Sequence, residues 1–114
     1  MQAEEIQDYC LKKKGVKESF PFNEETLVFK VGGKIFLLMS LESQPLKFSL
    51  KSTPEKNIEL RAKHYQIEGA FHMNKTHWNS VIYEAIKSSL IKELIDDSYD
   101  LVFKSLTKKM KDEV

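Results

Sequence analysis

Hydrophobic and polar residues alternate along the first half of the chain in a pattern that predicts antiparallel β-strands. Residues 26–31 carry an apolar side chain at every second position, and Gly32-Gly33 follows as a two-residue turn suited to positive φ. Residues 34–41 are apolar on both sides, as in a well-covered strand, and residues 46–51 alternate again. We therefore expect a three-stranded meander.

Helical spacing of apolar residues brackets this meander. Residues 4–14 carry a narrow apolar stripe that ends at Gly15, and residues 88–106 carry a longer one. Thr53 and Pro54 form a helix start, with Thr53 as N-cap, and that helix is expected to reach Lys63. Its spacing predicts that three residues are buried: Ile58, Ala62 and Tyr65.

A second hairpin is expected between the last two helices. Residues 66–72 and 77–83 are the predicted strands, and Asn74-Lys75-Thr76 is the turn. Residues 107–114 are charged and are expected to fray. The order α-β-β-β-α-β-β-α predicts one domain over residues 1–114, an α+β two-layer sandwich whose antiparallel sheet carries its helices on one face.

The amino-acid composition restricts the possible functions less than it restricts the possible folds. Apolar residues make up 41% of the chain and charged residues 31%, which is typical of a globular domain. The net charge is +1, but residues 27–83 hold eight Lys and Arg against four Asp and Glu, while both ends are slightly acidic. This distribution leans towards an anionic partner. The sequence pI of 7.8 is lower than the value above about 9 that is common in DNA-binding domains.

No catalytic, metal or cofactor motif is visible. The single cysteine, Cys10, lies on an apolar helix stripe, which predicts a buried thiol and fits a reducing compartment. His64, His72 and His77 lack neighbouring ligands for a tetrahedral set. We expect a cytoplasmic protein, since neither a signal peptide nor an apolar run of about 18 residues is present. Because no catalytic or cofactor motif is found, we also expect a protein that is not an enzyme and has no cofactor.

Short strings along nearly the whole chain, in order and at consistent spacing, carry a family resemblance. They are Tyr9-Cys10-Leu11, Gly15, Phe20-Pro21-Phe22, Phe29-Lys30-Val31-Gly32-Gly33-Lys34-Ile35-Phe36, Ser49-Leu50-Lys51, Pro54-Glu55, His72-Met73-Asn74-Lys75-Thr76-His77-Trp78 and Asp97-Ser98-Tyr99. Together they resemble the YjbR/MmcQ-type family of small bacterial proteins. The resemblance implies a two-layer fold similar to type III secretion chaperones, and DNA binding by a "double-wing" motif in which two hairpins act as wings.

The first functional hypothesis is duplex-DNA binding through basic hairpins. Lysines at strand faces and turns suit phosphate contacts. The alternative is that these residues only solvate the open face of an antiparallel sheet. The candidate residues are Lys30, Lys34, Lys47, Lys51, Arg61, Lys63, Lys75 and His77.

Trp78 is an aromatic suited to base stacking, although its spacing favours a core position beside the last helix. For Lys75 and His77 the turn role and the binding role stay equally open.

The second hypothesis is a protein-interaction module that contacts a partner or a second copy of the chain, as a monomer or weak homodimer. Val28, Phe36 and Leu38 are predicted to share a sheet face with the lysines. A mixed apolar and basic face suits a protein partner.

Overall fold

The fold was taken from a computed structural model that describes residues 1–70 and 73–114. The predicted α-β-β-β-α-β-β-α order is confirmed, and a strand, a 3₁₀ turn and a short helix are added to it. The elements are α1 (Ala3–Leu11), β1 (Val16–Ser19), β2 (Thr26–Val31), β3 (Lys34–Ser40), β4 (Lys47–Lys51), α2 (Pro54–Lys63), β5 (Ile67–Gly69), β6 (Trp78–Ile82), η1 (Tyr83–Ala85), α3 (Ser88–Ser105) and α4 (Lys108–Glu113).

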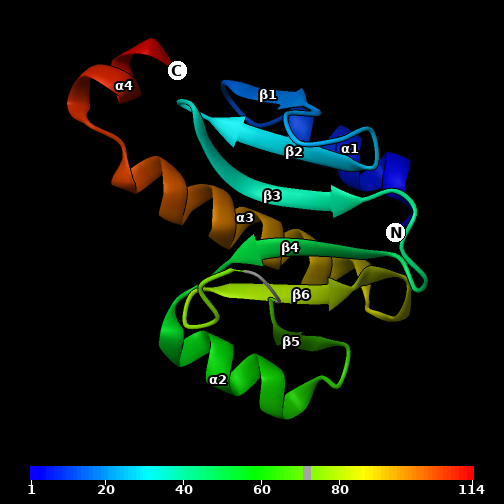
Figure 1. The fold of residues 1–114 in the computed structure, drawn as a ribbon. Helices are drawn as coiled ribbons and strands as arrows, with labels where there is room; N and C mark the ends of the chain where they lie inside the picture. The colour runs from blue at the N-terminus through cyan, green and yellow to red at the C-terminus, as the bar shows by residue number, and fades with distance from the viewer. Residues whose placement is uncertain (71–72) are drawn as a thin grey trace.

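One antiparallel sheet forms the first layer, with strand order β1-β2-β3-β4-β6-β5. The helices form the second layer on one face of it, and Figure 1 shows α3 crossing behind β3 and β4. Tyr9 of α1 and Lys13, which follows that helix, bind Asp96 of α3. Lys56 of α2 binds Asp97, so α3 lies between its two neighbours. None of the described helices lies on the other face of the sheet, and we call it the open face.

Side chains alternate between the two faces along each strand, and the buried apolar ones point to the helical side, where they form the core. Leu27, Phe29 and Val31 of β2 pack with Leu50 of β4 and Val81 of β6 in one buried cluster. The apolar stripe of α3 closes this cluster as predicted, through Ile91, Leu94, Ile95, Val102 and the following Leu106. Both glycines of the β2–β3 turn have positive φ, 57° and 79°, as the hairpin prediction requires.

A β-bulge in β3 breaks the alternation. Phe29 pairs with Leu37 while Lys30 pairs with Ile35, so Phe36 is the extra residue. Phe36 is therefore buried on the helical side, with its ring 5.5 Å from that of Tyr99. The Ser98 hydroxyl of α3 donates to the Phe36 carbonyl oxygen at 2.6 Å, which satisfies this buried acceptor beside the bulge.

The face of α2 that is buried differs from the face that the spacing of its apolar residues predicts. Thr53 caps α2 and Pro54 begins it, as expected. Its buried residues, however, are Asn57 and Leu60. The residues predicted to be buried are exposed: Ile58, Ala62 and Tyr65. A polar contact between side chains accompanies this orientation: the Asn79 side-chain amide donates to Asn57 Oδ1 at 2.6 Å.

The chain ends differ from the sequence expectation as well. Residues 107–114, which were expected to fray, contain the short helix α4: Thr107 caps it, and Met110 and Val114 pack against the core. A side chain at Gly15 would collide with Val114, so α4 approaches the backbone that follows α1. The predicted strand 66–72 is shorter in the structure, and its Phe71 and His72 lie outside the described residues. None of the described helices has the length and apolar character needed to span a membrane.

Candidate functional site

The open face gathers lysines, hydroxyls and half-buried apolar side chains. The strand register identifies the residues of this face. Cross-strand partners point to the same side of a sheet, and neighbours along a strand point to opposite sides. Residues next to a buried helical-side residue in the same strand therefore point to the open face. The residues that point to the open face are Lys17, Ser19, Thr26, Val28, Lys30, Ile35, Leu38, Ser40, Lys47, Ser49, Lys51, Glu68, Trp78, Ser80 and Ile82. Among the described strand residues, Glu68 is the one acid on this face, against four lysines, so the face is basic although the chain is nearly neutral.

Two of these lysines stand directly opposite each other. Lys17 of β1 is the cross-strand partner of Lys30 of β2. Like charges in this position destabilise a sheet. Neither ammonium forms an ion pair in the described part of the chain. A depression of about 340 Å³ adjoins both residues, with Glu113 of α4 on its rim.

Lys47 and Lys51 lie on the same side of β4, as predicted. Lys47 approaches Glu68 at 3.8 Å, a loose ion pair between two partly exposed groups. Lys51 is the cross-strand partner of Trp78. The prediction that Trp78 lies in the core was wrong, since it sits half-buried on the open face. Trp78 and Ser80 are two residues apart in one strand, so they point to the same face, while the buried Val81 points to the other. This alternation could have placed Trp78 on the open face.

The structure removes Arg61 from the predicted set of binding cations. Its guanidinium donates to Asn79 Oδ1 at 2.8 Å and to the Trp78 carbonyl oxygen at 3.2 Å, and it also donates to the Lys75 carbonyl oxygen. These contacts hold the β5–β6 connection against α2. Arg61 is therefore a structural clamp.

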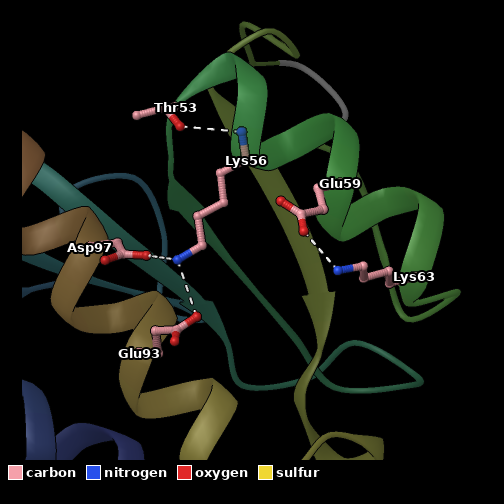
Figure 2. A network of polar contacts seen from close by, with 6 residues as sticks. All are labelled: Thr53, Lys56, Glu59, Lys63, Glu93 and Asp97. Atoms are coloured by element: carbon pink, nitrogen blue, oxygen red, sulfur yellow. Dashed lines mark hydrogen bonds and ion pairs between the residues drawn. The ribbon is translucent and has the colours of Figure 1, made fainter.

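Two further candidates also point elsewhere. Lys34 pairs with Val31 on the helical side of the sheet, and its ammonium lies 3.5 Å from the Ser105 carbonyl oxygen of α3. Lys63 stays on the outer side of α2 and pairs with Glu59 at 2.7 Å, as Figure 2 shows. Neither shares a surface with Lys30, so the β2–β3 hairpin does not carry lysines on one face as predicted.

Lys75 and His77 lie in the connection from β5 to β6, where the turn was predicted. The Asn74 side chain accepts from the Thr76 N–H at 3.0 Å, and the Asn74 carbonyl accepts from the N–H groups of His77 and Trp78. Lys75 is exposed and its stem lies beside Gly69, while His77 is half-buried. The turn thus presents Lys75 at one margin of the sheet. His72 lies outside the described residues.

The predicted apolar interaction face is only partly present. Phe36 belongs to the core beneath α3, and Val28, although it points to the open face, is fully buried. Leu38 remains half-buried and accessible. It forms part of a groove of about 500 Å³ on the open face, together with Phe22, Lys47 and Met73. Sequence reasoning missed the contributions of Phe22 and Met73, because both come from connections outside the strands.

The charges of the helical layer contrast with those of the open face because they are paired. Figure 2 shows the Lys56 ammonium between Asp97 and Glu93, reaching Glu93 at 3.1 Å. Burial opposes the charge of Lys56, but hydrogen bonds to these two carboxylates outweigh it and raise the Lys56 pKa. This cluster ties α2 to α3.

Titratable groups of the core are held neutral. Burial raises the pKa of the Cys10 thiol to about 12, so the prediction of a buried thiol is confirmed. Burial likewise raises the pKa of Tyr83. Among residues 1–70 and 73–114, no three His, Cys, Asp or Glu side chains gather in a way that could hold a metal ion.

Comparison with known proteins shows what the chain is similar to. The family model described as YjbR matches residues 11–101. The uncharacterised protein YbdF of Escherichia coli O157:H7 is 43% identical over 96 residues, which cover 82% of this chain and 78% of YbdF. The uncharacterised protein YjbR of Escherichia coli K12 is 32% identical over 101 residues, which cover 87% of this chain and 85% of YjbR.

Solved structures agree with the fold. A crystal structure of a Deinococcus radiodurans protein with a DUF419 domain superposes with a TM-score of 0.90 at 36% identity, over 98% of this chain and 86% of that one. A crystal structure from Pseudomonas syringae gives a TM-score of 0.77 at 28% identity, over 90% of this chain and 99% of that one. The names of these proteins assign no activity to them.

Proposed function

The chain belongs to the YjbR family, and from this premise we propose that the open face of its sheet binds nucleic acid through contacts between lysines and phosphates. The face carries Lys17, Lys30, Lys47 and Lys51 against one acid, Glu68. Hydroxyls lie between the lysines, and both groups are common donors to phosphate oxygens. The proposal is binding without catalysis.

The opposed pair Lys17 and Lys30 is the observation that carries the proposal. Two ammonium groups facing each other across strands cost stability in the free protein. An anion placed between them removes that cost, since it attracts both charges. Binding of a polyanion therefore explains an arrangement that folding alone does not favour.

Three of the predicted cations lie elsewhere, and this moves the interface that we propose. The resemblance implies two basic hairpins acting as wings, but Lys34, Arg61 and Lys63 lie away from the open face. The remaining lysines lie on the strands, with Lys75 at the margin. We place the interface on the sheet surface itself.

Titration of a labelled oligonucleotide by fluorescence anisotropy at 50 and 200 mM salt tests the proposal. Four phosphate contacts to duplex DNA predict a loss of affinity of about 100-fold between these concentrations. The double variant Lys30→Gln with Lys51→Gln should lose at least about tenfold at 50 mM salt and show a shallower salt slope.

Lys12→Gln with Lys87→Gln is the matched control. Both residues are exposed and lie outside the sheet, and the change in net charge is the same. The control should bind as the unaltered protein does. No binding at 50 mM salt, or equal losses in both double variants, would contradict the proposal.

A second candidate is a protein partner on the same face, favoured by the groove that contains Leu38, Phe22 and Met73. Phe22 lines this groove and is 64% exposed, so its ring is available to a partner, and aromatic residues are enriched at protein interfaces. Salt separates the two candidates, because an apolar contact does not weaken as salt rises and a phosphate contact does.

A further inference from the structure

The groove on the open face combines an apolar slot with polar margins. Its volume of about 500 Å³ is within the range of small-molecule sites. Leu38 contributes to it from β3, while Phe22 and Met73 contribute from the connections before β2 and before β6. These side chains offer a surface on which a flat, apolar group can lie.

Phe22 is held in place although it is exposed. Pro21 restricts the backbone that leads into it. Immediately after it, the Asn23 side-chain oxygen accepts from the N–H groups of Glu25 and Thr26, both at 2.8 Å. Phe22 makes no ring contact with another residue in the part of the chain that the structure describes. The backbone on both sides of Phe22 is thus restrained, and its ring has no aromatic partner among the described residues; a restrained backbone lowers the entropic cost of stacking on the ring.

The margins of the groove supply hydrogen-bonding groups and one positive charge. Ser40 and Ser49 border it from the strands, and Lys47 does so with its ammonium. The buried Ser43 hydroxyl, also at the groove, has no hydrogen-bond partner among residues 1–70 and 73–114. Hydroxyls both donate and accept, so they suit the edge of a nucleobase, and an ammonium suits the phosphate beside it.

These features favour a single strand over a duplex. In a duplex the flat faces of the bases are stacked on one another and cannot enter a groove. Single strands are bound on surfaces that combine aromatic side chains with a basic track, and the lysines of the open face provide such a track. We infer that the groove binds one unstacked base of a single-stranded nucleic acid, while Lys47 and its neighbours hold the backbone. This inference rests on the proposed function.

Two aromatic residues of one connection allow a matched test. Phe22 lies at the groove, whereas Phe20, 48% exposed, borders a different depression beside α1. Phe22→Ala and Phe20→Ala remove the same ring from exposed positions two residues apart. Each variant is titrated at 50 mM salt with labelled oligothymidylate of about 15 nucleotides and with a hairpin duplex of equal phosphate count.

The unaltered protein should bind the single strand at least tenfold more tightly than the duplex. Phe22→Ala should weaken single-strand binding fivefold or more and change duplex binding less than twofold, because only an unstacked base uses the ring. Phe20→Ala should change either affinity less than twofold. Equal affinity for both oligonucleotides, or equal effects of the two variants, overturns the inference and leaves lysine-based binding standing. Absence of binding to both overturns the proposed function as well.

Discussion

The two faces of the sheet are built from the same strands but meet different demands. On the helical side, Phe29, Phe36 and Leu37 are fully buried, and the adjoining helices pair their charges, as Lys56 does with Asp97. On the open side, Lys17 faces Lys30 and the apolar residues are mostly half-buried. The helical side therefore stabilises the fold, while the open side keeps an unfavourable charge arrangement that a ligand can relieve.

Core truncation is the largest expected difference between the faces. Phe36→Ala should lower the free energy of unfolding by about 3–5 kcal/mol, because it leaves a cavity between β3 and α3. Leu38→Ala, two residues along the same strand, should cost about 1 kcal/mol, since Leu38 is half-buried on the open side. Urea unfolding measures both. Equal losses would mean that the open face is as closely packed as the helical one.

The pH dependence of the free energy of unfolding tests whether water is excluded from the core on the helical side. The folded pKa of Cys10, about 12, exceeds its ordinary value of 9.0 because the thiol is buried. The stabilisation is therefore complete below pH 9 and is lost as the pH rises towards 12, by about 1.4 kcal/mol per pH unit for one proton. Cys10→Ala should show a shallower decline between pH 9 and 11 in guanidinium unfolding. Parallel declines would place water at Cys10.

Single lysine substitutions give the smallest and most discriminating effect. Lys56→Met should lower the free energy of unfolding by about 1 kcal/mol, because it leaves Asp97 and Glu93 without their partner. Lys30→Thr should instead raise it by about 0.3 kcal/mol, since it relieves the repulsion from Lys17. Thermal unfolding at low salt measures both changes. A destabilising Lys30→Thr would show that this lysine serves the fold and would weaken the case for a ligand.

Local signals allowed much of the fold to be predicted. The Gly32-Gly33 turn, the Thr53-Pro54 helix start and the long stripe of α3 are each encoded within a few residues, so they were found. Edge strand β1 was missed because Val16 is its only apolar residue, and this hid Lys17 from the candidate set. Its pairing with β2 depends on tertiary contacts, which the local sequence does not show.

The candidate site was predictable only where alternation holds. Lys30, Lys47 and Lys51 were placed correctly on one face, since the extra residue belongs to β3 and the alternation within β2 and β4 is intact. Phe36 was misplaced because the extra residue is specified by packing against Tyr99 and Ser98, far along the chain. Arg61 was misassigned for a similar reason. Its hydrogen-bond acceptors lie 14 to 18 positions further along the chain, and nothing in its own helix indicates them.

The extra residue in β3 has a consequence for sequence alignment. Removing Phe36 would let Leu37 and Ile35 keep the partners that they already have, Phe29 and Lys30, in a regular ladder. A relative with a one-residue gap at this position would lose an aromatic contact of the core, yet its lysines would stay on the same side. A gap there therefore marks a change in packing and leaves the open face, with its proposed binding residues, aligned.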